Sequence, residues 1–343
     1  MYLKRLKTQV KSNVNMLTFA TRFKKELLML NRRLIRVKVL QAVYAYHQSE
    51  VKDIRSAKSF LRKSINGIED TFINILQFPY DLFHFVKTNY NPADKHLKVK
   101  NESGSLFSYL SENKCLDLLT GHPKTKEIFT ISSYNWNKDS DFLFTIYKQI
   151  GESDWIKQFE NTDSSDYSRS YEFLTTLYKY LIETSEDFNT KMEEISIHWQ
   201  DEKIPVLKSI EKLLKSCSEE DGSNISVPLI SKDLDDDMDY SEKLLEITTK
   251  NHDKFEDLIA KRTPEWDSER IARIDLFIMI MALAEFMEFP NIPVKVTLNE
   301  YLELAKIYST PQSSKFINGI LDKLLNELKK EGKVIKQGRG LVE

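Results

Sequence analysis

The chain has 343 residues, enough for one large domain or two ordinary ones. Nine glycines, nine prolines and 30% charged residues favour long helices over a turn-rich sheet. The net charge of -2 alone speaks against a nucleic-acid partner, but the charge is unevenly distributed. Eleven lysines and arginines face two acids in residues 1–50, whereas residues 233–239 are strongly acidic.

Several classes of site are absent from the sequence. Cys115 and Cys217 have no neighbouring cysteine or histidine at a ligand spacing, which argues against a disulfide framework or a zinc site and predicts reduced thiols in the cytoplasm. The longest apolar run, 276–284, has about half the length of a membrane span, so no membrane partner is expected. There is no glycine-rich phosphate loop and no pair of histidines at metal-ligand spacing. The sequence therefore predicts no enzyme, no cofactor and no metal.

Residues 1–28 are basic and lack the apolar core and cleavage site of a secretory signal. Met29 directly precedes an arginine-rich motif, and Lys25-Glu26 corresponds to purine-rich codons that resemble a ribosome-binding site. Two interpretations stay open. Translation starts at Met29, or residues 1–28 are a disordered basic arm that adds non-specific RNA affinity.

Residues 31–48 are expected to form an amphipathic helix with Asn31 as its N-cap. At about 100° per residue, one side collects the apolar residues Ile35, Val39, Ala42 and Tyr46. The other side carries the candidate RNA-contacting residues Arg33, Arg36 and Tyr44, and Arg32 and Lys38 lie on the same helix. Arginines contact phosphates and an exposed tyrosine stacks on bases. The alternative is a solvated basic face with Tyr44 half-buried in packing.

Further helices are expected near residues 54–76 and 80–90, separated by Phe78-Pro79. Residues 91–140 are mixed and polar, which is typical of short helices and loops, and residues 141–216 are helical again. This segment matches the C-terminal region at a constant offset of 67, with Trp199-x-x-Glu-Lys-Ile corresponding to Trp266-x-x-Glu-Arg-Ile. The match indicates a degenerate repeat, or else coincidence between two amphipathic helices. Residues 217–232 form the best linker candidate.

In the C-terminal region, the apolar run 276–284 predicts a helix at the buried centre of a bundle. Thr297 and Glu300 are spaced as a capping box that would start the next helix, which ends near 308. Thr310-Pro311 offers another N-cap. The last helix has apolar residues every three or four positions, ends near Gly332 and precedes a basic tail.

Two of these motifs resemble the NusB family of bacterial RNA-binding transcription antitermination factors. They are NRRLIRVKVLQAVYAY at 31–46 and the stretch 266–321, which contains most of SSKFINGILD at 313–322. The resemblance implies an all-α, NusB-like helical bundle, here with an additional helical middle region, as in the long Bacteroidetes-type members. The implied division is a basic extension at 1–28, N-terminal helices at 29–90, an inserted region at 91–232, a C-terminal bundle at 233–331 and a basic tail at 332–343.

The resemblance also implies partners. The family binds boxA-type single-stranded RNA of ribosomal RNA operons, through positions that match Arg32, Arg33, Arg36 and Tyr44. Lys38 belongs to the same basic cluster and is expected to contact RNA with them. A second implied RNA cluster, at the start of the last helix, comprises Gln312, Ser313, Lys315 and Phe316. For Phe316 the alternative is a core aromatic that closes the bundle.

For protein partners, the resemblance implies pairing with NusE, a small-subunit ribosomal protein, within the RNA polymerase elongation complex. Asp275 matches an acidic position that contacts NusE, and its alternative role is capping or ion pairing beside Arg270 and Arg273. Two other functions are alternatives to RNA binding. One is a protein-only scaffold of the transcription or ribosome-assembly machinery, and the other is part of an RNA methyltransferase system.

Overall fold

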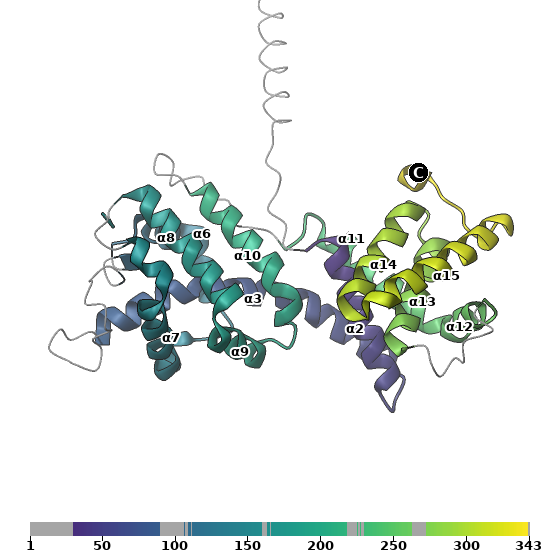
Figure 1. The fold of residues 1–343 in the computed structure, drawn as a ribbon, viewed down its shortest axis with the longest axis horizontal. Coiled ribbons are helices and arrows are strands. Elements are labelled where there is room, and N and C mark those ends of the chain that lie inside the picture. The colour runs from purple at the N-terminus through teal and green to yellow at the C-terminus, as the bar shows by residue number, and fades with distance from the viewer. Residues whose placement is uncertain are drawn as a thin grey trace, which may run out of the picture. The chain divides into compact units, whose positions relative to one another are not determined.

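The computed structural model describes residues 30–89, 106–159, 163–217, 225–262 and 272–341, apart from 107–108, 111, 165, 226 and 228–229. Within these residues it contains helices and no strand, so the predicted all-α class is confirmed (Figure 1). The open question of the start at Met29 lies outside them. None of the helices in this part of the chain has the length and apolar character needed to cross a membrane.

The chain divides into two compact units, described separately below. Unit 1 contains Ile68–Lys232, and unit 2 combines Leu30–Gly67 with Asp233–Glu343. Unit 1 is thus inserted into unit 2 along the sequence. The sequence placed the divisions at 90/91 and 232/233, whereas the contacts place the first one inside helix α3 (Ile54–Asn89).

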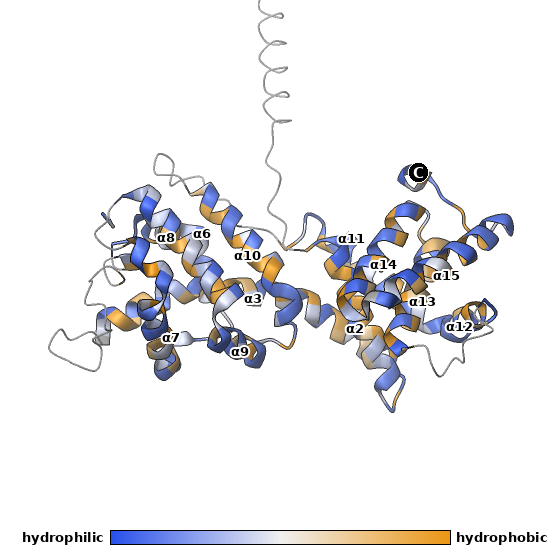
Figure 2. Cartoon of the chain, in the orientation of Figure 1, coloured by the Kyte–Doolittle hydropathy of each residue, from blue (hydrophilic) through white to orange (hydrophobic). Residues whose placement is uncertain are grey.

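Unit 2 is a helical bundle around α13 (Arg273–Glu288). The helix is apolar and almost wholly buried, as its sequence predicted, and it packs against five other helices of the unit. Those are α2 (Arg32–Gln48), α11 (Leu234–Lys250), α12 (His252–Ala260), α14 (Val294–Tyr308) and α15 (Pro311–Lys330). In contrast to α13, most helices have one apolar and one polar face (Figure 2).

Three helix ends that the sequence predicted for unit 2 follow local capping rules. The Asn31 side chain accepts a hydrogen bond from the Leu34 N–H at 2.9 Å, which confirms the predicted N-cap of α2. The Thr310 side chain caps α15 in the same way. Beyond α15, Gly332 adopts the left-handed conformation (φ 67°) that ends a helix, as predicted.

The predicted capping box of α14 is wrong. The helix begins at Val294, after Pro293, so Thr297 and Glu300 lie inside it. Thr297 is buried and its hydroxyl donates to Glu285 Oε1 at 2.8 Å. Glu300 instead pairs with an arginine of α2. Both residues serve tertiary contacts, which their spacing in the sequence could not reveal.

In unit 1, α3 continues through Pro79, so the predicted break at Phe78-Pro79 is also wrong. Proline cannot donate the backbone hydrogen bond of a helix interior and crowds the preceding turn. Two carbonyls of that turn find other donors: the Trp136 indole donates to Asn74 O and the Tyr178 hydroxyl to Leu76 O, each at 2.8 Å. The carbonyl that Pro79 itself leaves without a donor is that of Ile75, and these two tertiary contacts hold the carbonyls on either side of it.

The rest of unit 1 contains six further α-helices of 8 to 18 residues within the described part of the chain. They are α5 (Lys114–Gly121), α6 (Pro123–Thr130), α7 (Ser140–Glu152), α8 (Tyr167–Lys179), α9 (Glu186–Ile195) and α10 (Trp199–Ser216). Trp199 is buried at the first residue of α10, and its indole donates to Asn189 Oδ1 at 2.9 Å. Trp266, its counterpart in the predicted repeat, lies outside the described residues, so the repeat stays a prediction.

The two cysteines are free thiols, and both are buried in unit 1. The Tyr167 hydroxyl donates to Cys115 Sγ at 3.8 Å and also to the Cys217 carbonyl. The hydrogen bond with Cys115 and burial raise the pKa of the Cys217 thiol. The fold therefore brings together two cysteines that the sequence showed only as far apart.

Candidate nucleic-acid interface

Two adjacent arginines are exposed at the start of α2. The side chains of Arg32 and Arg33 keep 40% and 45% of their surface in solvent. Arg33 makes a two-pronged contact with Glu300 of α14, in which Nε and Nη2 each lie 2.9 Å from a carboxylate oxygen. Capping by Asn31 fixes the backbone at the start of the helix, and the contact with Glu300 holds the Arg33 guanidinium in a defined position.

Arg32 is held differently, by the acidic first turn of α11. Its Nη2 pairs with Asp236, and its Nε lies 3.3 Å from Asp237 Oδ1. The guanidinium carbon also lies 4.3 Å from the centroid of the Tyr240 ring, a cation–π geometry. Arg32 and Arg33 line an open groove of about 1410 Å³, to which the C-terminal segment contributes Arg339.

Arg36 departs from the predicted exposed face. Only 1% of its surface is accessible. Its Nε and Nη2 donate to the two oxygens of Glu285 at 2.9 and 2.7 Å. The hydroxyls of three more residues donate to the same carboxylate: Tyr240 at 2.7 Å, Thr297 at 2.8 Å and Tyr301 at 3.2 Å. We call this set the Glu285 network.

The charge state of the network follows from its contacts. Burial alone would raise the pKa of the Glu285 carboxyl, but the hydrogen bonds and the charge of Arg36 outweigh it and hold the pKa below its ordinary value. An ionised pair is thus buried at the centre of unit 2 with most of its hydrogen-bonding capacity satisfied. Arg36 Nη1 also donates to the Arg32 carbonyl at 3.1 Å, which ties the network to the first turn of α2.

The expectation that Arg36 and Lys38 face a bound RNA is therefore corrected. Lys38 is as buried as Arg36, with no accessible surface. The helical-wheel argument assumed one buried side of α2, but the helix packs against both α11 and α13. Every residue from Leu34 to Leu40 is consequently buried.

Tyr44 stands three turns farther along α2, about 16 Å from Arg33 along the helix axis. Its ring is 42% exposed and meets Phe277 edge-on, with centroids 6.1 Å apart. The two alternatives for Tyr44 are therefore compatible. Packing against Phe277 fixes the ring, and part of its surface remains open to a stacking base.

The second predicted cluster lies on the first two turns of α15. Gln312 and Lys315 are exposed, while Ser313 and Phe316 are partly buried. Backbone N–H groups at a helix start attract anions, and Lys315 adds a positive charge there. Phe316 combines packing with partial exposure, so neither of its two predicted roles is excluded.

Asp275, the predicted partner-binding residue, lies in the first turn of α13 and is 5% exposed. Its Oδ1 has no hydrogen-bond partner among the described residues. Arg270, one of its two predicted ion-pair partners, lies outside the described residues. The capping alternative finds no support in the described contacts.

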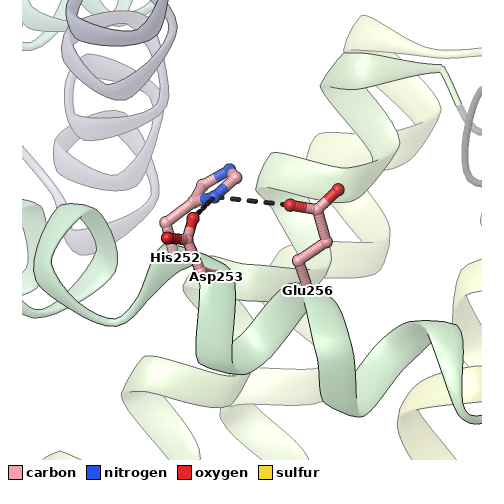
Figure 3. Close-up of side chains that lie close together, drawn as sticks. All are labelled: His252, Asp253 and Glu256. Atoms are coloured by element: carbon pink, nitrogen blue, oxygen red, sulfur yellow. Dashed lines mark hydrogen bonds and ion pairs between the residues drawn. The ribbon is translucent and has the colours of Figure 1, made fainter.

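α12 carries a cluster of metal-ligand side chains that was not predicted from the sequence (Figure 3). His252 Nδ1 lies 3.2 Å from Asp253 Oδ1 and 3.6 Å from Glu256 Oε2. The sequence contains the pattern H-D-x-x-E at 252–256, which places the histidine and the glutamate one helical turn apart. A histidine and two carboxylates are ligands that a divalent cation accepts, but ion pairing at a helix start accounts for the same contacts.

His47 contacts this cluster through its ring. Its centroid lies 4.2 Å from that of His252 and 5.0 Å from that of Phe277. Burial, followed by the charges of His252 and Lys52, lowers the pKa of His47 to about 4, although Asp253 opposes the shift. His47 is consequently neutral in the folded protein near pH 7.

We expect this neutral histidine to make unit 2 less stable in mild acid. Because the pKa is lower in the folded state than in the unfolded chain, the unfolded state binds the proton first. His47 therefore stabilises the fold above pH 6.5, and this contribution is lost between pH 6.5 and 4. After discounting for the solvent that reaches the half-buried ring, the loss should be roughly 1 to 2 kcal/mol.

The check is urea unfolding at pH 7.5 and pH 4.5 of the protein and of His47→Phe, which keeps a ring but cannot titrate. The variant should lose less stability on acidification than the unaltered protein. Equal losses would mean that His47 does not titrate in this way.

Comparison with known proteins decides the family. A model of the NusB family matches residues 207–326. The transcription antitermination protein NusB of Salinibacter ruber is 38% identical over 117 residues, which are 33% of this chain and 73% of that protein. The chain belongs to the NusB family. NusB of Chloroherpeton thalassium is 43% identical over 105 residues, which are 31% of this chain and 50% of that protein. NusB of Natranaerobius thermophilus is 40% identical over 91 residues, which are 26% of this chain and 66% of that protein.

Family membership confirms the resemblance and gives the chain a role in transcription antitermination. It also agrees with the prediction that the chain is not an enzyme, because its NusB relatives are antitermination factors. No solved structure matches the chain significantly. The NusB match starts at residue 207 and so leaves out α2, which packs against α11 and α13 inside the matched region.

Proposed function

We propose that this NusB-family chain is a non-catalytic antitermination factor that binds boxA-type single-stranded RNA of ribosomal RNA operons together with NusE. The observation that carries the proposal is the pair of exposed arginines, Arg32 and Arg33, at the capped start of α2. Guanidinium groups supply positive charge and hydrogen-bond donors for phosphate oxygens, which positions a strand on the protein.

The remaining contacts of the proposed interface come from two other places. Tyr44 offers part of its ring to a base, and base–aromatic stacking tolerates any sequence. At the start of α15, Lys315 and the positive end of the helix dipole receive a second phosphate. Arg36 does not touch RNA in this scheme. It anchors the first turn of α2 from inside, through Glu285 and the Arg32 carbonyl.

NusE and the RNA polymerase elongation complex are the proposed protein partners, in the cytoplasm. Asp275 supports the NusE part, since it is a buried carboxylate with an oxygen that no described residue satisfies. Unit 2 contains all of the proposed contacts. Unit 1, including the predicted repeat, serves as scaffold in this scheme.

The proposal is tested by filter binding of a boxA RNA oligonucleotide over a salt series, with and without NusE. Changing Arg32 and Arg33 to alanine should lower the affinity at least tenfold at low salt. It should also flatten the slope of log K against log salt by about 0.7 for each lost phosphate contact. Both side chains are partly exposed and their ion pairs lie at the surface, so the fold should persist.

The matched control is Arg55→Ala with Lys63→Ala, which removes two exposed positive charges from α3 in the same unit. This variant should bind RNA nearly as well as the unaltered chain. If both double variants lose affinity equally, only net charge matters and the site is wrongly placed. If the unaltered chain binds NusE but no RNA, a protein-only scaffold is the better description.

A further inference from the structure

The exposed arginines differ in how firmly their carboxylate partners are held. Glu300, the partner of Arg33, is 21% exposed and also lies 3.9 Å from Arg36 Nη1. It is therefore attached to the buried Glu285 network. Asp236, the partner of Arg32, keeps 66% of its side chain in solvent. Of the two carboxylates, Asp236 is the one that can leave its arginine at little cost.

The fold does not need Asp236 on Arg32. The N-cap of α11 is Asp233, whose side chain accepts a hydrogen bond from the Asp236 N–H at 3.0 Å. The helix start therefore has its cap independently of the Asp236 carboxylate. An exposed ion pair of this kind is worth only about 0 to 1 kcal/mol, so its loss is tolerable.

Carboxylate and phosphate compete for the same donors. Asp236 occupies Nη2 of Arg32 and Asp237 lies at Nε, so the guanidinium edge that would grip a phosphate is already in use. A phosphate that approaches Arg32 must displace Asp236 and also meets its negative charge. Asp237 is only 15% exposed and is less able to move.

We propose that Asp236 is a built-in competitor of RNA phosphate for Arg32 and thereby sets the RNA affinity of the α2 interface. The inference rests on the proposed RNA-binding function and adds a regulating residue to that site. RNA binding becomes an exchange of partners at Arg32, in which Asp236 turns out to solvent as a phosphate takes its place. The acidic turn at the start of α11 lowers non-specific binding, because only a strand held by other contacts as well displaces it.

The test is the affinity of a boxA RNA oligonucleotide for the full chain carrying Asp236→Asn. The substitution removes the competing charge and should raise the affinity about three- to tenfold at low salt. The matched control is Asp235→Asn, which changes the same net charge in the same helical turn at an exposed residue. It should raise the affinity less than twofold. In the background of Arg32→Ala, Asp236→Asn should have no more effect than the control.

The outcomes separate this inference from the proposed function. If the unaltered chain binds RNA and the two asparagine variants behave alike, competition at Arg32 is wrong and the RNA-binding function stands. The same conclusion holds if Asp236→Asn acts fully without Arg32. If neither the unaltered chain nor Asp236→Asn binds RNA, the proposed function fails and this inference with it.

Discussion

Replacing Arg36 with alanine is expected to destabilise unit 2 by about 3 to 5 kcal/mol. The substitution leaves the Glu285 carboxylate buried without its positive partner, and removing one member of a buried ion pair costs far more than losing an exposed pair. Three hydroxyl groups still donate to Glu285, but they do not neutralise its charge. The carboxyl should respond by binding a proton, which its depressed pKa now prevents.

Because the chain has two units, the effect should be measured inside unit 2. Hydrogen exchange of the amides of α13 reports opening of the helix that carries Glu285. Exchange there should become at least a hundredfold faster in Arg36→Ala. In Arg33→Ala, which breaks an exposed pair on the same helix, it should change less than tenfold.

A second substitution tests the cause. Adding Glu285→Leu to Arg36→Ala removes the stranded charge and should recover part of the stability, even though the hydroxyl groups lose an acceptor. If Arg36→Ala alone leaves α13 exchange unchanged, Arg36 does not hold the network together. RNA binding should decline in Arg36→Ala as well, because the first turn of α2 loses its anchor to the network.

Local sequence signals predicted what local interactions determine. The N-caps Asn31 and Thr310 and the C-terminal Gly332 were correct because each acts on residues within one turn. The buried centre at 276–284 was correct because a run that is apolar all round has no face to present to water.

Long-range pairs explain the failures. Arg36 looked like a member of a basic face, but its partner Glu285 is 249 positions away in the sequence. Thr297 and Glu300 had the spacing of a capping box, yet each contacts a residue of another helix. Pro79 lies inside α3, where Trp136 and Tyr178 of later helices donate to the carbonyls on either side of Ile75. No periodicity within α2, α3 or α14 encodes these partners.

The candidate site shows the same division. The sequence identified Arg32, Arg33 and Tyr44 as surface residues of one helix, and the structure exposes all three at least in part. It could not show that the acidic run at 233–239 supplies the carboxylates beside Arg32. The basic start of α2 and the acidic run at 233–239 are separated in the sequence by unit 1, yet they are in contact in the fold.

Gly340→Ala is expected to displace the C-terminal segment from unit 2. A Cβ atom at this buried position would lie 1.9 Å from the Pro290 carbonyl oxygen, far inside van der Waals contact, so the backbone must shift. The shift would break the hydrogen bond from the Gln337 N–H to the same oxygen and loosen Lys336, which donates to the Phe289 carbonyl. Overpacking of this kind costs roughly 1 to 3 kcal/mol. Arg339 would leave the groove that it lines with Arg32 and Arg33.

Limited trypsin digestion measures this displacement, because the segment contains Lys336 and Arg339. Cleavage there should be at least fivefold faster in Gly340→Ala than in the unaltered chain. The matched control is Gly319→Ala, an exposed position inside α15 where a Cβ meets nothing within 4 Å. It should leave cleavage unchanged and stabilise the helix by about 0.5 to 1 kcal/mol, since alanine loses less conformational entropy than glycine. Equal cleavage of both variants would show that the segment does not pack on the Pro290 turn.

RNA affinity of Gly340→Ala tests the role of Arg339. If Gly340→Ala opens the segment but leaves the RNA affinity unchanged, Arg339 takes no part in RNA binding, and Arg32 and Arg33 bind RNA without it.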